Sequence, residues 1–216
     1  MIGELVGYSA IIAGITVGGI ALYTAMRYRK FFYSFLFLGL SFLSYGITEA
    51  AWLAVEMAEM DLYPSTIDAG YVAYFGFAIL HVLTILRIMK GHRFNVEQLV
   101  IVVTLTVSLI GMYGIASLSE DIDHEVFLYG GFFATLAAIL ASLTLIAMTT
   151  FYPTALKMAW LFIGSSIFIA SLTDVWYYAQ ENVTGYNYVD FPLMDGLWIV
   201  TDIIMVAGIV LHRRAI

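Results

Sequence analysis

The sequence has no cysteine and few charged residues. Without cysteine, disulfides, thiolate metal ligands and thiol catalysis are excluded. Charged residues make up 12% of the chain and hydrophobic residues 62%, whereas soluble domains carry about 25% charged residues. We therefore expect this chain to lie mainly within a lipid bilayer.

Long hydrophobic stretches are separated by short connections. A helix rises about 1.5 Å per residue, so about 20 apolar residues cross a hydrocarbon core about 30 Å thick. Seven such stretches occur, at approximately residues 5–26, 31–56, 66–88, 98–118, 126–150, 157–181 and 194–211. The first lacks the basic start and the cleavage site of a signal peptide, so we expect it to be retained. Within it, Gly14 and Gly18 form a GxxxG pattern, which predicts a close-packed helix face. The predicted fold class is all-α, an integral membrane domain of seven transmembrane helices over residues 1–216.

Basic residues are absent from one side of this predicted domain. All nine lysines and arginines fall on the other side: Arg27, Arg29, Lys30, Arg87, Lys90, Arg93, Lys157, Arg213 and Arg214. The charged residues of the opposite connections are acidic: Glu59, Asp61, Glu120, Asp121, Asp123 and Glu125. The positive-inside rule predicts a multi-pass protein of the cell membrane with its N-terminus outside and its C-terminus in the cytoplasm. The net charge of −7 also argues against nucleic acid as a partner.

The two halves of the sequence match at a shift of 125 residues. Phe37, Gly39, Ser41, Thr48, Glu49, Trp52 and Glu56 align without gaps with Phe162, Gly164, Ser166, Thr173, Asp174, Tyr177 and Glu181. Further on, after a gap in the alignment, Asp68 and Tyr71 align with Asp195 and Trp198 at a shift of 127 residues. The match predicts a 3+1+3 arrangement of parallel repeats, about 5–90 and about 126–214, with the helix at 98–118 as the linker. Such repeats imply a pseudo-two-fold axis along the membrane normal, and a symmetric site near it.

Paired acidic residues define the candidate site. Glu49 and Asp174 lie deep in their stretches, and Asp68 and Asp195 begin the stretches that follow. Ionisable groups inside a membrane are costly, which makes them functional candidates. If the axis brings the four together, they form a cavity in the outer half that accepts a cation, an amine or protons, since four carboxylates cannot all stay ionised alone. Oxygen ligands favour hard ions over zinc. The candidate ligand-binding set also includes four aromatic residues on the same helix faces: Trp52, Tyr71, Tyr177 and Trp198.

Several of these acids also fit purely structural roles. Asp68 and Asp195 suit the starts of helices, where a carboxylate complements the helix dipole. Glu56 and Glu181 are predicted at helix ends, where water is accessible. Asp202 is the strongest anomaly, because it is predicted near mid-membrane while its counterpart in the first half is Phe75. With Asp195 and Trp198 it forms a stripe about 10 Å long, which is either a carboxylate path or a set of packing hydrogen bonds.

Motifs of catalytic and metal centres are missing. The four histidines show neither HxxxH nor HExxH spacing, and serine-hydrolase and phosphate-loop patterns are absent too. His81 is predicted to face away from Asp68, as a packing residue, whereas His92, His124 and His212 fall at helix ends or in connections. We therefore expect a protein that is not an enzyme.

The segment from Ile47 to Tyr74 contains the run Tyr63, Pro64, Ser65, Thr66, Ile67 and Asp68. This run resembles the FPSxAD or YPSxAD signature of multi-helix membrane regions in prokaryotic sensor kinases and diguanylate cyclases, with Ile67 in place of the usual small residue. The resemblance implies a membrane sensory module for a ligand of unknown identity. We expect no kinase or cyclase domain after Ile216, so a sensor of this kind is expected to need a partner protein for its output.

The overall layout also resembles the microbial rhodopsins, which share the N-out topology and a 3+1+3 plan. Asp202 and Gly208 carry the similarity in the last helix. In those proteins the retinal lysine follows the aspartate by four residues, and here that position is Val206. The three lysines lie at cytoplasmic helix ends, so we expect neither a buried Schiff base nor a retinal cofactor. Sugar transporters of the SWEET class resemble the chain in architecture only.

Three functions follow from these patterns. The first is a retinal-free seven-helix sensor or ligand-binding protein with a carboxylate cavity for a cation or small ligand. The second is a small-solute or cation/proton transporter whose two halves rock about the axis, with Asp202 relaying charge. The third is a structural subunit of a membrane complex.

Overall fold

The chain forms seven α-helices, which the computed structural model describes over residues 2–58, 66–90, 95–118, 124–152, 154–184 and 192–215. The helices are α1 (Ile2–Arg27), α2 (Phe32–Met57), α3 (Ala69–Lys90), α4 (Val96–Ala116), α5 (His124–Phe151), α6 (Lys157–Thr184) and α7 (Pro192–Arg214). Two short 3₁₀ helices precede α2 and α3, η1 (Arg29–Phe31) and η2 (Thr66–Asp68). All seven α-helices are long and apolar enough to cross a membrane. The predicted all-α, multi-pass membrane fold is thus confirmed.

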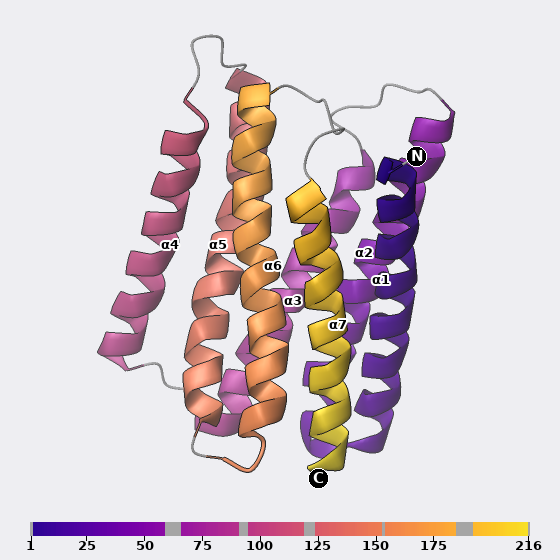
Figure 1. Cartoon of the computed structure of the whole chain (residues 1–216). Coiled ribbons are helices and arrows are strands. Elements are labelled where there is room, and N and C mark those ends of the chain that lie inside the picture. The colour runs from indigo at the N-terminus through magenta and orange to yellow at the C-terminus, as the bar shows by residue number, and fades with distance from the viewer. Residues whose placement is uncertain are drawn as a thin grey trace.

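Six of the seven helices form a ring. Among the described residues, α1 contacts α2 and α7, α2 contacts α3, α3 contacts α5, α5 contacts α6, and α6 contacts α7. Helix α4 lies outside this ring against α5 and α6 (Figure 1). Its apolar side chains Val103, Val107 and Ile115 are exposed, as expected for a helix that faces lipid. The ring encloses the aromatic and aliphatic core of the molecule.

Helices α1 and α2 approach one another closely because glycines meet at their crossing. A Cβ atom added at Gly14 would lie 2.6 Å from the Cα atom of Gly46 and 2.8 Å from the carbonyl oxygen of Phe42. At Gly18 it would lie 2.8 Å from the side chain of Leu43. The close-packed face that the GxxxG spacing predicts is therefore present, and it faces α2.

The same hydrogen bond occurs at aligned positions of the two halves. The hydroxyl of Ser41 on α2 donates to the carbonyl oxygen of Tyr74 on α3 at 2.9 Å. The hydroxyl of Ser166 on α6 donates to the carbonyl oxygen of Thr201 on α7 at 2.7 Å. The helix contacts are also related, because exchanging α1, α2 and α3 with α5, α6 and α7 turns the α3–α5 contact into the α7–α1 contact. The aligned halves therefore pack in corresponding ways.

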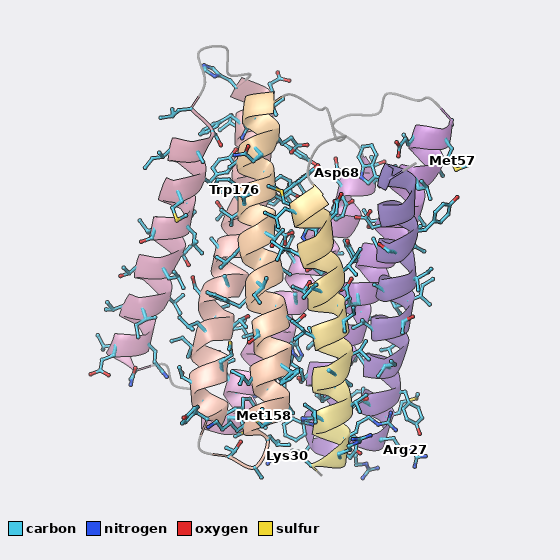
Figure 2. The ribbon with its side chains drawn as sticks, viewed as in Figure 1. Arg27, Lys30, Met57, Asp68, Met158 and Trp176 are labelled. Atoms are coloured by element: carbon cyan, nitrogen blue, oxygen red, sulfur yellow. The ribbon has the colours of Figure 1, made fainter. Side chains whose placement is uncertain are left out.

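The two ends of the bundle differ in charge. Figure 2 shows Arg27 and Lys30 at one end, and Met57 and Asp68 at the other. We call these the basic end and the acidic end. The acidic connections predicted from the sequence (Glu59, Asp61, Glu120, Asp121 and Asp123) lie outside the described residues, as do Arg93 and the residues Tyr63, Pro64 and Ser65 of the signature.

Candidate functional site

A cavity of about 500 Å³ lies inside the ring. It extends from the last turns of α2 and α6, at Glu56 and Glu181, to Met205 in the middle of α7. Ten of its lining residues are aromatic: Phe42, Tyr45, Trp52, Tyr71, Tyr74, Phe75, Tyr129, Tyr177, Tyr178 and Trp198. Five are acidic: Glu49, Glu56, Asp174, Glu181 and Asp202. None of the lining residues, all in the described part of the chain, is Lys, Arg or His. The cavity is therefore both aromatic and negatively charged.

One wall of the cavity comes from α2 and α3. Tyr45, Glu49, Trp52 and Glu56 recur every three or four residues along α2, so they share the helix face that lines the cavity. The phenol hydroxyl of Tyr71, on α3, donates to Oε1 of Glu49 at 2.7 Å. This bond fixes the carboxyl group and ties α2 to α3 beside the cavity.

The opposite wall comes from α6 and α7 and repeats this arrangement. Asp174, Tyr177 and Glu181 occupy the positions that align with Glu49, Trp52 and Glu56, and all three line the cavity. The indole Nε1 of Trp198, on α7, donates to Oδ1 of Asp174 at 2.9 Å. Each half thus holds a cavity acid by one hydrogen bond from an aromatic residue on its neighbouring helix.

Charge is concentrated within the cavity. The carboxyl groups of Glu49 and Asp174 line the same cavity from opposite walls, so they repel one another when both are ionised. Asp202 lies one helical turn beyond Trp198 toward the basic end, and it also lines the cavity. Its aligned residue, Phe75, lines the cavity from α3. The cavity therefore combines a symmetric pair of acids with a third acid that has no counterpart.

The structure brings seven of the nine predicted site residues to the cavity: Glu49, Trp52, Tyr71, Asp174, Tyr177, Trp198 and Asp202. Asp68 and Asp195 are not among the lining residues. Asp68 is buried at the end of η2, and Asp195 is partly exposed in the first turn of α7. Helical side chains point toward the N-terminus of their helix, so these two acids lie nearer the acidic end than Tyr71 and Trp198. The four carboxylates predicted to meet are replaced by Glu49 and Asp174 together with Asp202, Glu56 and Glu181.

Several lining residues were not predicted. Glu181 was expected to meet water at a helix end, but it is buried, whereas Glu56 is exposed at the rim. Tyr45 and Tyr178 stand four residues from Glu49 and Asp174, so helical spacing carried a signal for both. Tyr129 comes from α5, where no spacing links it to the acids.

A second buried cluster lies beyond the cavity toward the basic end. His81 on α3 is fully buried, and its Nδ1 lies 3.0 Å from Oγ and 2.8 Å from the carbonyl oxygen of Ser34. Its ring stacks on Trp160 with 5.6 Å between ring centroids. His212 lies in the last turn of α7, as predicted, and it is fully buried against Phe31 and Phe35, with 4.8 Å between its ring centroid and each of theirs. This cluster fills the bundle between the cavity and the basic end.

No set of three or more histidine, aspartate and glutamate side chains that could hold a metal ion occurs in the described ranges. No protein-family model matches the chain, and no curated protein or solved structure is similar to it. The resemblances to sensor modules and to microbial rhodopsins therefore stay predictions from the sequence.

Proposed function

We propose that this chain is a retinal-free seven-helix membrane sensor or ligand-binding protein that takes a cation or small ligand into the cavity. The observation that carries the proposal is a cavity of about 500 Å³ with five acidic and no basic residues among its described lining. Carboxylates gathered at membrane depth are costly to ionise together. A cationic ligand offsets that cost and is attracted by their field.

The orientation of the chain is part of the proposal. The basic end carries Arg27, Lys30, Arg87 and Arg214, and the positive-inside rule assigns such an end to the cytoplasm. The rim of the cavity, where Glu56 is exposed, then faces the outside of the cell membrane. A ligand would enter from there.

Binding can alter helix packing because the cavity acids also join helices. The Tyr71–Glu49 bond connects α3 with α2, and the Trp198–Asp174 bond connects α7 with α6. A cation that competes for these carboxylates changes both connections. A ligand shifts a conformational equilibrium by the difference in its affinity for the two states. The resulting change in helix packing would be transmitted to a partner protein.

A thermal-shift experiment tests the proposal. Purified protein in one detergent is screened against inorganic cations, organic amines and neutral solutes. We expect at least one ligand to raise Tm, and the Glu49→Gln, Asp174→Asn double variant to lose that rise. Glu97→Gln is the matched control, because Glu97 is exposed in the first turn of α4. A flat response across the panel, or an unchanged response in the double variant, would contradict the proposal.

The second candidate is a transporter for small solutes, cations or protons. Asp202, in the middle of α7, has no acidic counterpart in the first half of the chain. Its position favours a transporter, since buried acids in transporters relay charge. A carrier would also have to open the cluster around His81, Trp160 and His212, all of which are fully or almost fully buried. Substrate flux in proteoliposomes that responds to a pH gradient, and that is lost in Asp202→Asn, would favour the transporter over the sensor.

A further inference from the structure

The sign of the charge in the cavity restricts the ligand. Glu49, Asp174 and Asp202 lie in its interior, and no basic side chain of the described lining is available to pair with an anion. An anionic ligand would be repelled, and a neutral one would leave the repulsion between Glu49 and Asp174 in place. Only a cation both enters and relieves that repulsion.

The size of the cavity argues against a bare inorganic ion. Its volume of about 500 Å³ is in the range of pockets that bind organic molecules, roughly 300–1,000 Å³. A site for a hard metal ion needs several oxygen ligands converging at about 2.0–2.6 Å, and no group of three or more candidate ligands is found in the described residues. An organic cation, which has an apolar part as well as a charge, fits the cavity better than a bare inorganic ion.

The aromatic residues of the cavity walls favour a ligand with an apolar part and an ammonium group. Tyr177 and Trp198 lie 5.5 Å apart between ring centroids beside Asp174, and Tyr45 and Tyr74 lie 5.4 Å apart on the other wall. Rings grouped in this way provide apolar contact area, and their faces attract organic ammonium groups by cation–π interaction. Carboxylates supply the complementary charge and accept hydrogen bonds from any N–H group.

We propose, as a refinement that rests on the proposed function, that the ligand is an organic ammonium ion with an apolar body. Its charged nitrogen lies between Glu49 and Asp174, and its body packs on the aromatic walls toward Phe75 and Met205. The N–H groups of the ammonium ion compete with Tyr71 and Trp198 for the two carboxyl groups, so occupancy of the site alters the α2–α3 and α6–α7 connections. Trp52 covers the nitrogen from the side of the rim.

A series of probes that differ only in charge tests this assignment on the unaltered protein. Phenethylamine, 2-phenylethanol and phenylacetate share one aromatic body and carry positive, zero and negative charge. Affinity is measured by calorimetry in detergent, with sodium, potassium, magnesium and calcium chloride as inorganic probes. We expect the amine to bind about tenfold more tightly than the alcohol, as the combined cation–π and ionic contacts imply, and the carboxylate not to bind.

Variants then test whether Glu49 and Asp174 bind the charged nitrogen of the ligand. Glu49→Gln and Asp174→Asn retain an oxygen that accepts the bond from Tyr71 or Trp198, so the packing is kept while the charge is removed. We expect each to reduce the preference of the amine over the alcohol, and the double variant to abolish it. Glu97→Gln should leave the preference unchanged. Because the probe series needs no variant, the inference stays testable even where a variant fails to fold.

The outcomes separate this inference from the proposed function. If the inorganic cations bind through Glu49 and Asp174 and the amine does not, or if amine and alcohol bind equally, the proposed function stands and the ammonium assignment is overturned. If the amine is preferred and the double variant keeps that preference, the placement of the nitrogen is overturned. If none of the probes and no member of the wider panel binds, both fall together.

Discussion

The two hydrogen bonds beside the cavity use different donors. Tyr71 bonds Glu49 through a phenol hydroxyl, which can also accept a hydrogen bond, whereas Trp198 bonds Asp174 through an indole N–H, which can only donate. The first bond can reverse direction when Glu49 takes up a proton, and the second cannot. Asp174 is therefore held as an acceptor in every state of the cavity, and Glu49 is not.

Loss of the indole donor should destabilise the protein. In Trp198→Phe the carboxyl group of Asp174 loses its hydrogen bond inside the bundle, which we expect to lower the free energy of unfolding by about 1–3 kcal/mol. The measurement is chemical unfolding in a single detergent. Trp176→Phe is the matched control, because Trp176 is 48% exposed and faces away from the core; it should change the free energy by less than about 0.5 kcal/mol. Equal losses in the two variants would contradict the role assigned to this bond.

At the level of helices, close approach and ring order decide where the cavity forms. The contact between Gly14 and Gly46 brings α1 against α2, while the neighbouring face of α2, with Glu49, lines the cavity. Helix α4 contacts only α5 and α6 among the described elements and supplies no lining residue. The cavity is thus built by two sets of three helices.

Gly14→Ala should weaken the α1–α2 contact. Its methyl group would lie 2.6 Å from the backbone of Gly46, so the helices must move apart, at a cost of about 1–3 kcal/mol. Gly19→Ala is the control, since an added Cβ there meets nothing within 4 Å and alanine favours the helix by about 0.5–1 kcal/mol. We expect a lower Tm in the first variant and an equal or higher Tm in the second. A Tm for Gly14→Ala at or above that of the natural protein would refute the close contact.

Sequence patterns predicted the helices better than the contacts between their side chains. Hydrophobic length predicts each span, because the bilayer requires it, and the predicted spans agree with the helices to within a few residues. Helical spacing likewise groups Trp52 with Glu49, and Tyr177 with Asp174. The repeat predicted the helix at 98–118 as the linker, and α4 is the helix that lies outside the ring. Which side chains of the other helices meet in the cavity depends on packing between helices, which periodicity along one helix does not describe.

Individual misses have the same origin. Asp68 and Asp195 align with each other, yet alignment does not reveal how far along its helix a side chain reaches. The predicted position of His212 at a helix end is correct, but its burial was not predicted, because Phe31 and Phe35 from another part of the chain cover it. Contacts between distant segments decided these positions.

For the molecule as a whole, the charge asymmetry predicts its orientation in the cell membrane. The chain has no cysteine, so single cysteines can be introduced without a labelling background. We expect His124→Cys, at the acidic end, to react with a membrane-impermeant maleimide in intact cells, and Arg214→Cys, at the basic end, to react only after permeabilisation. The cysteine-free protein is the control, and the reverse pattern would overturn the N-out orientation.

Among the described residues, the two sets of three helices meet at two places, α3 with α5 and α7 with α1. Glu49 belongs to the first set and Asp174 to the second. A ligand held between them would therefore bridge the two halves noncovalently, across the same gap that the peptide chain bridges through α4. Occupancy of the cavity and the angle between the halves would then be thermodynamically linked. A partner protein that contacts both halves would respond to that angle.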